Sequence, residues 1–212
     1  ALATARSFPK SPEAARLYAE GLDHSRRFDL LGARTLLERA TVTEPEFAMA
    51  HAALAEIWQR LGYDARASAE AERAFTLAGE LRREERLLVE ARFRETAHDW
   101  DRAIALRREL WRDYPDDNQH GRRLVESLLG ANQAQEALRL AEDLARLPPP
   151  AGGDPNIALN EAIAAIKLSD FTRAVGAAQR AAQQGHALGS GRAVASARLQ
   201  ESQALLRLGD SA

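Results

Sequence analysis

Small residues recur in this sequence at a fixed interval of 34 residues. Ala33 and Ala40 are followed 34 positions later by Ala67 and Ala74, and Ala103 continues the frame after an insertion of two residues. A fixed period of this length is typical of repeat proteins, in which each copy folds as one supersecondary unit and stacks on its neighbours. The period therefore favours an array of repeats over one compact domain for this chain of 212 residues.

The spacing of prolines and apolar residues indicates that the repeated unit is helical. Proline is absent from 46–114 and from 156–212, and a proline in a helix interior costs about 3 kcal/mol. Ala103, Leu106 and Leu110 follow the spacing of one face of a helix. Alternating runs of Val, Ile and Thr, which are typical of strands, are missing. We therefore predict an all-α fold.

Further positions are shared among the copies. Five copies begin at residues 14, 48, 84, 118 and 155, and the twentieth residue of each is alanine. The eighth residue is glycine or alanine in four of them: Gly21, Ala55, Ala91, Val125 and Ala162. These positions resemble the tetratricopeptide repeat (TPR) family, whose unit is a helix–turn–helix. The resemblance implies a right-handed superhelix, or α-solenoid, in which small residues let the two helices of a unit pack closely.

This alignment also predicts how the chain is organised. We expect a leader over 1–13, four units over 14–147, a Pro/Gly-rich loop over 148–155, and a fifth unit with the first helix of a sixth over 156–212. Because the array stops halfway through a unit, we expect the chain to be a piece of a longer protein. Of the first 151 residues 49 are charged, against 11 of the last 61. The weakly charged end either offers a surface to a partner or a second copy, or packs against a continuation of the array.

Composition and motifs argue against several classes of function. Lys and Arg total 29 against 31 Asp and Glu, whereas non-specific binding to nucleic acid needs a positive excess. No apolar run approaches the length of a membrane span. Cysteine is absent, and the five histidines form no H-E-x-x-H pattern. No nucleophile, base and orienting group occur together. We therefore expect no catalytic residue, no cofactor and no metal.

The resemblance implies a binding groove on the concave face, which the first helix of each unit lines. Such a groove suits an extended peptide or a partner helix. In TPR units the second, fifth, ninth, twelfth and thirteenth residues face it. The predicted groove residues include Tyr18, Leu22, Arg26, Met49, Glu56, Gln59, Arg60, Leu88, Arg92, Glu95, Arg122, Glu126, Leu159, Ile163 and Lys167. A plain exposed helix face is the alternative for each of them. The Lys and Asn set with which chaperone-binding TPR proteins hold a terminal carboxylate is missing, so we do not expect a co-chaperone.

The seventh unit position carries an unusual residue. It is glutamate in units one, three and five and in the partial sixth, namely Glu20, Glu90, Glu161 and Glu201, whereas TPR units usually have an apolar residue there. A buried carboxylate needs hydrogen-bonding partners. The glutamates therefore form either structural salt links to neighbouring arginines or an acidic element in the groove.

Two segments carry a finer resemblance. Residues 12–21 and 84–95 resemble TPR regions attached to bacterial Ser/Thr protein kinases, and similar regions occur in membrane-anchored winged-helix regulators. This resemblance implies a sensor or regulatory region, cytoplasmic or periplasmic, whose catalytic or DNA-binding domain lies outside this chain. The alternative is a structural solenoid that self-associates, for example as a homodimer.

Overall fold

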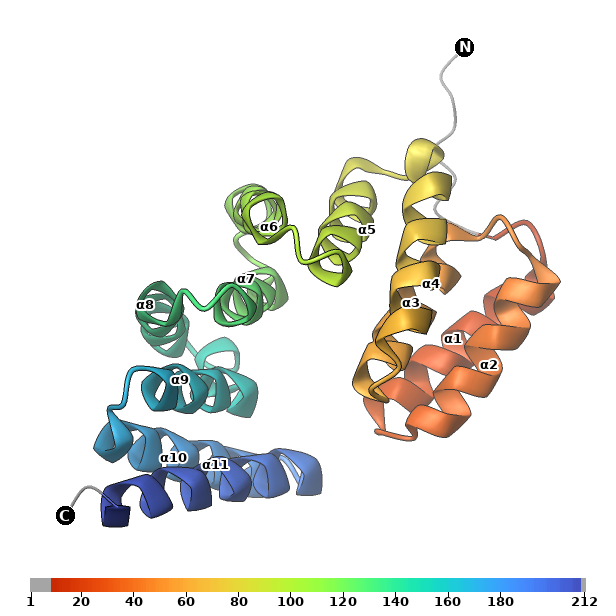
Figure 1. Ribbon diagram of the computed structural model, residues 1–212. Helices are drawn as coiled ribbons and strands as arrows, with labels where there is room; N and C mark the ends of the chain where they lie inside the picture. The colour runs from red at the N-terminus through yellow and green to blue at the C-terminus, as the bar shows by residue number, and fades with distance from the viewer. Residues whose placement is uncertain (1–8, 211–212) are drawn as a thin grey trace. The chain divides into compact units, whose positions relative to one another are not determined.

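The computed structural model describes residues 9–210, which form helices joined by short connections (Figure 1). In chain order the α-helices are α1 (Pro12–Arg26), α2 (Leu30–Thr43), α3 (Ala48–Arg60), α4 (Asp64–Leu77), α5 (Arg83–Thr96), α6 (Trp100–Asp113), α7 (Asn118–Gly130), α8 (Ala134–Ala145), α9 (Pro155–Lys167), α10 (Phe171–Ala187) and α11 (Gly191–Asp210). Residues 9–210 contain no strand, so the predicted all-α fold is confirmed. No helix in this range is long and apolar enough to cross a membrane.

Helices α1 to α10 follow one another as five pairs, and within the described range α11 has no second helix after it. The predicted leader falls mostly on residues 1–8, which lie outside the described residues. Ser11 ends it as an N-cap, because its side chain accepts the N–H of Ala14 at 3.2 Å. Pro12 then begins α1 at a position where the missing N–H of proline has no effect on helix bonding.

The chain divides into two compact units, the first ending at Leu106 and the second beginning at Arg107. This boundary lies inside α6, whereas the Pro/Gly-rich loop lies within the second unit. The loop contains a short 3-10 helix, η2 (Ala151–Gly153). Asn118 Nδ2 donates a hydrogen bond of 3.3 Å to the carbonyl of Ala151. The loop is therefore docked on α7, not an open linker.

In the first unit the helices of a pair approach closely at a glycine. Leu37 of α2 is fully buried and packs with Leu54 and Trp58 of α3. Gly21 of α1 faces it, and a Cβ atom on Gly21 would lie 2.8 Å from the Cγ of Leu37. The small residue at the eighth unit position is therefore what lets α1 lie against α2.

In the second unit α9, α10 and α11 pack on one another mainly through alanine. The alanines of this core are at most 5% exposed: Ala158, Ala162, Ala165, Ala174, Ala177, Ala178, Ala181, Ala182, Ala197 and Ala204. Interaxial distances between packed helices depend on the side chains at the contact, and methyl groups allow the short end of the range. The alanines of the repeat pattern thus form the contact surfaces between helices.

The turns inside the five pairs, and the turn before α11, share one backbone conformation. One residue in each has a positive φ, between 57° and 81°: Phe28, Gly62, His98, Asn132, Ser169 and Gly189. In every turn the N–H of the next residue bonds to the carbonyl five residues earlier, at 2.8 to 3.0 Å. This is the Schellman arrangement, which ends a helix with a left-handed residue. Two of the six residues are glycine and one is asparagine, which also adopts this conformation, so three turns hold a residue that disfavours it.

We expect Ser169→Gly to stabilise the chain. The left-handed conformation costs a non-glycine residue about 1–2 kcal/mol, and the larger entropy that glycine loses on folding offsets part of the gain. The expected increase in the free energy of unfolding is about 0.5–1 kcal/mol, measured by urea denaturation. The reverse change, Gly62→Ala, should lower it by about 1 kcal/mol. A loss of stability in Ser169→Gly would contradict this account of the turn.

Candidate functional site

The first unit contains a pocket of about 430 Å³ between α1 and α3, with the start of α5 at its edge. This volume is in the range of about 300–1,000 Å³ that is usual for ligand sites. The lining residues are Pro9, Ala15, Tyr18, Ala19, Leu22, Arg26, Phe47, Met49 and Glu85, most of them apolar. The pocket therefore brings together Tyr18, Leu22, Arg26 and Met49, which the unit positions predict to share one face.

Tyr18 is the polar group in the apolar part of this pocket. Its ring meets the ring of Phe47 edge to face, with centroids 4.9 Å apart. Burial raises the pKa of Tyr18 to about 12, and the nearby carboxylates of Glu85 and Glu56 act in the same direction. The hydroxyl therefore remains protonated at physiological pH and can donate a hydrogen bond inside the pocket.

Two residues of opposite charge, Arg26 and Glu85, complete the pocket lining. Nη2 of Arg26 lies 3.3 Å from Oδ1 of Asp23, and the Arg26 side chain is 69% exposed. Glu85 Oε2 accepts the backbone N–H of Arg82 at 3.3 Å, which caps the start of α5. Because most of the Arg26 side chain remains in solvent, it can still contact a carboxylate of a bound molecule.

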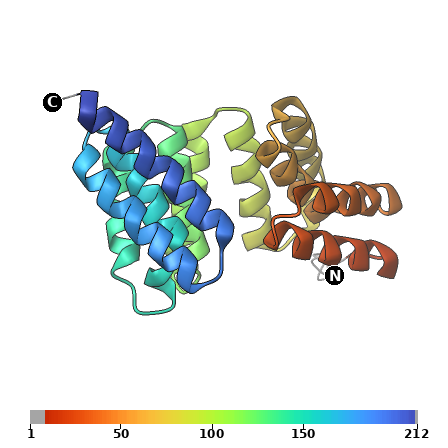
Figure 2. The same cartoon turned by 90° about the horizontal axis from the view of Figure 1, so that it is seen from below.

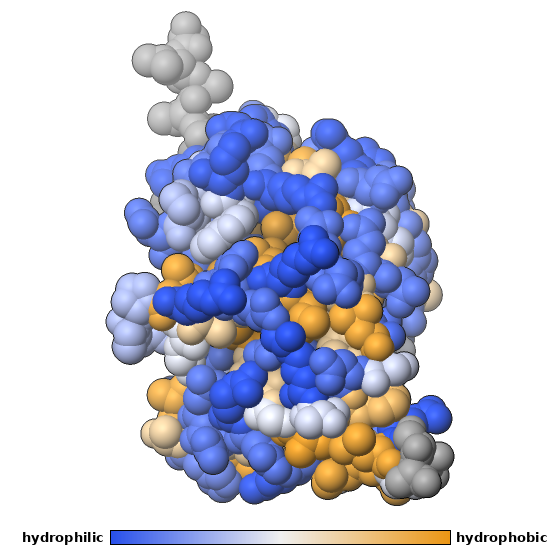
Figure 3. Space-filling view, turned by 90° about the vertical axis from the view of Figure 1, so that its left-hand side faces the viewer, coloured by the Kyte–Doolittle hydropathy of each residue, from blue (hydrophilic) through white to orange (hydrophobic). Residues whose placement is uncertain are grey.

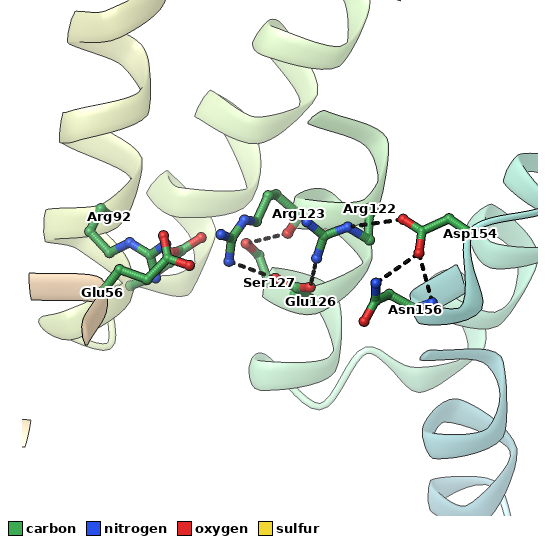
Figure 4. Close-up of polar contacts among 9 residues, drawn as sticks. Glu56, Arg92, Arg122, Arg123, Glu126, Ser127, Asp154 and Asn156 are labelled. Carbon is green, nitrogen blue, oxygen red and sulfur yellow. Dashed lines mark hydrogen bonds and ion pairs between the residues drawn. The ribbon is translucent and has the colours of Figure 1, made fainter. Parts of the chain in front are cut away.

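Arg92 of α5 connects two consecutive first helices (Figure 4). It donates from Nη2 to Oε2 of Glu56 at 3.0 Å and from Nη1 to Oε1 of Gln59 at 2.8 Å, and both acceptors lie on α3. Glu95 Oε2 lies 3.7 Å from Nη1 of Arg92. The Arg92 side chain is only 12% exposed. Four predicted groove residues thus form one polar link between helices, in which the charge of Arg92 is matched by carboxylates.

Arg122 of α7 makes a similar link inside the second unit. It donates from Nη1 to Oε1 of Glu126 at 2.5 Å, and its Nε lies 3.7 Å from Oδ2 of Asp154. Asp154 also caps α9 by accepting the N–H of Asn156 at 2.9 Å. Figure 4 shows this chain of contacts running from α7 to the start of α9.

Arg60 and Lys167 lie at the C-terminal ends of their helices and contact a neighbouring turn. Arg60 donates from Nη1 to Oγ of Ser25 at 2.9 Å, and its guanidinium carbon lies 5.4 Å from the centroid of the Phe28 ring. Lys167 donates from Nζ to Oδ1 of Asn132 at 3.4 Å. Each of these predicted groove residues therefore contributes to holding one pair of helices against the next.

Solved structures with this arrangement of helices are repeat proteins. A tetratricopeptide repeat protein from Parabacteroides merdae ATCC 43184 aligns with a TM-score of 0.65 at 12% identity, over 91% of this chain and 71% of its own. A thermophilic TPR protein from Thermus thermophilus aligns with a TM-score of 0.61 at 15% identity, over 91% of this chain and 99% of its own. The chain has the tetratricopeptide-repeat fold.

A third TPR structure was solved with a partner. The TPR2AB domain of yeast Sti1, in its complex with pHSP90, aligns with a TM-score of 0.52 at 13% identity, over 91% of this chain and 86% of its own. The sequence itself matches no protein-family model and has no significant match among curated proteins. The likeness to solved TPR structures therefore lies in the arrangement of helices.

The glutamates at the seventh TPR position form salt links. Glu161 is buried in the second unit, where its Oε1 accepts from Nε of Arg173 at 3.1 Å and its Oε2 from Nη2 of Arg180 at 2.7 Å. Arg173 also pairs with Glu142 of α8. The other three glutamates have arginine partners as well: Glu20 with Arg16, Glu90 with Arg94 and Arg102, and Glu201 with Arg198. The structure favours the structural interpretation over an acidic element in the groove.

The predicted groove residues do not include several residues that line the pocket. Ala15 and Glu85 occupy the second TPR position of units one and three, as Met49 does in unit two. The same unit positions that predict the groove residues therefore also indicate Ala15 and Glu85. Phe47 precedes the start of unit two and has no groove position in the TPR pattern. In the sequence Phe47 is marked only as a large aromatic residue that comes directly before α3.

Proposed function

We propose that this TPR chain is a protein–protein interaction module that binds an extended segment of a partner protein. In this proposal one large apolar side chain of the partner enters the pocket of the first unit. The main support is the pocket of about 430 Å³ in the first unit. Two consecutive repeats contribute predicted groove residues to its lining, namely Tyr18, Leu22, Arg26 and Met49. The complex of the Sti1 TPR2AB domain with pHSP90 supports a protein partner for this fold.

The pocket chemistry defines what the partner segment should contain. Leu22, Phe47 and Met49 provide an apolar wall, which suits an aliphatic or aromatic side chain. Methionine adapts to partners of different shape. The Tyr18 hydroxyl is a donor for a backbone carbonyl, and Arg26 can pair with a carboxylate that follows the apolar residue. We therefore propose a segment with one large apolar residue and an acidic neighbour.

The remaining polar residues of the predicted groove take a supporting part in this proposal. Arg92 of α5 bonds to Glu56 and Gln59 of α3, and Arg60 of α3 bonds to Ser25 of α1. In the second unit Arg122 approaches Asp154 at the start of α9, and Lys167 bonds to Asn132. Glu95 and Glu126 pair with Arg92 and Arg122 of their own helices and so hold these arginines in place. A bound segment then contacts a groove whose wall is already formed, which reduces the entropy lost on binding.

The pocket can be tested with a displayed library of random linear peptides, selected on the wild-type chain. Ala19 lines the pocket and is exposed, so Ala19→Arg places a long charged side chain there without disturbing the core. We expect selected peptides to lose at least about tenfold in affinity for Ala19→Arg, which is about 1.4 kcal/mol. Ala69→Arg, at an exposed alanine of α4, is the matched control and should bind like the wild type. Equal binding by both variants, or a selection that enriches no peptide, would count against the pocket.

The context of the module is a further part of the proposal. We propose that it is the sensor or regulatory region of a larger bacterial signalling protein, such as a Ser/Thr protein kinase. The support is the resemblance of residues 12–21 and 84–95 to TPR regions of such proteins. Sequencing the complete gene tests it, because a kinase or DNA-binding domain in the same reading frame is expected. An open reading frame that encodes only repeats would contradict it.

A further inference from the structure

Within residues 9–210, the last helix of the second unit has an apolar face that no other helix covers. On one side α11 packs against its neighbours through Ala193, Ala197 and Ala204, which are buried. On the opposite side Leu199 is 57% exposed and Leu206 is 70% exposed. In the view from below, no other helix of residues 9–210 lies in front of α11 (Figure 2). Hydrophobic surface is also visible beside the C-terminal end of the chain (Figure 3).

The residues along this face alternate between large and small. In order they are Ala195, Leu199, Ser202 and Leu206, with spacings of four, three and four residues, and all four are exposed. Spacings that alternate between three and four residues form a straight seam along a helix, which is the spacing of residues that meet a second helix. The seam, defined by these four residues, lies opposite the buried alanines and so faces away from the rest of the second unit.

We propose that the seam pairs with the seam of a second copy of this chain, with the two α11 helices antiparallel about a two-fold axis. The pattern of large and small residues is complementary to itself in this arrangement. Leu199 then lies opposite Ser202 of the partner subunit, and Leu206 lies opposite Ala195 of the partner subunit. Every leucine therefore meets a small residue, and the same contacts occur twice, as an isologous interface requires.

The charges near the seam are compatible with this pairing. Arg198, beside the seam, is already paired with Glu201 of its own helix at 2.6 Å. Arg192, one turn before the seam, lies opposite the C-terminal end of the partner helix, where the helix dipole favours a positive charge. None of the four seam residues is charged, so no like charges meet along the seam itself.

The expected dimer is weak and reversible. A helix of 20 residues is about 30 Å long, and one face of it covers less than the roughly 800 Å² per partner of a stable interface. We therefore expect a dissociation constant on the order of tens of micromolar. This association involves the second unit, and the proposed peptide pocket lies in the first, so either proposal can fail without the other.

Sedimentation equilibrium of the chain from about 1 μM to about 300 μM tests the dimer. The weight-average mass should rise from 23.3 kDa towards twice that value. The double variant Leu199→Glu with Leu206→Glu should remain monomeric throughout. Leu31→Glu with Val42→Glu, at residues of α2 that are 61% and 79% exposed, should dimerise like the wild type, and circular dichroism checks that all variants are folded. A wild-type monomer at every concentration, or a dimer that survives the α11 changes, would overturn the proposal.

Disulfide cross-linking tests whether the two helices are antiparallel. Because the chain contains no cysteine, only the introduced cysteines can form a disulfide. Ala195→Cys and Leu206→Cys variants are mixed and oxidised. Antiparallel pairing predicts disulfides between the two different variants and few between identical ones, because identical positions are about 16 Å apart along the axis. Disulfides mainly between identical variants would show a parallel pair, and no disulfide above the level of an Ala69→Cys control would overturn the contact.

Discussion

Replacing Glu161 by alanine should lower the free energy of unfolding of the second unit by about 2–3 kcal/mol. Glu161 accepts from Arg173 and Arg180 and is 6% exposed. Removing one member of a buried ion pair leaves the other charge without its partner, which costs about 3–5 kcal/mol when both groups are buried. Here the two arginines are partly exposed, and Arg173 keeps Glu142, so we expect a smaller loss of about 2–3 kcal/mol.

Urea denaturation followed by circular dichroism measures this loss without the salt screening that guanidinium adds. Glu136→Ala is the matched control, because Glu136 also pairs with an arginine, Arg108 at 2.6 Å, but at an exposed position. Exposed pairs contribute about 0–1 kcal/mol. Equal losses in the two variants would mean that burial of Glu161 has no energetic role.

Leu37→Ala should cost about 3–4 kcal/mol in the first unit. Leu37 is fully buried between helices, so its loss removes apolar burial and leaves a cavity. The cavity lies beside Gly21, where an added Cβ would otherwise lie 2.8 Å from Leu37 Cγ. Gly21→Ala should therefore destabilise the wild type by about 1–2 kcal/mol.

The two changes should be strongly coupled. In the Leu37→Ala background the clash is absent, so Gly21→Ala gains helix propensity of about 1 kcal/mol and fills part of the cavity. The effect of Gly21→Ala should then change sign, from destabilising to stabilising. Urea unfolding of the wild type, the two single variants and the double variant measures this coupling. Additive effects would contradict a direct contact between Gly21 and Leu37.

The helices and their pairing were predictable from local patterns. The period of small residues predicts both the unit and its contact surfaces, because alanine and glycine are required where helix backbones approach. The turns were harder to locate from residue type. Phe28 and His98 adopt the left-handed conformation that Gly62 adopts, and nothing in an isolated phenylalanine or histidine indicates it. The neighbouring helices impose this conformation, so the repeat frame locates it better than residue type does.

The pocket was predictable in part. The unit positions identify Tyr18, Leu22, Arg26 and Met49, because a fixed position on a repeated helix faces a fixed direction. They do not reveal that Arg92 is enclosed by Glu56, Gln59 and Glu95. Such partners come from the next repeat, and their distance depends on how the repeats stack. A charge-reversing change at Arg92 would therefore test the link between α3 and α5 more than it tests partner contact.

The alanine core of the second unit has a consequence for how that unit responds to sequence change. An alanine side chain has no rotamers to lose, so burying it carries no side-chain entropy cost. For the same reason the neighbouring alanines cannot change rotamer to make room for a larger side chain. The helices themselves must then separate to accommodate it. The contact surfaces of α9, α10 and α11 should thus accept serine or glycine far more readily than valine or leucine, the opposite of the tolerance of a leucine-rich core.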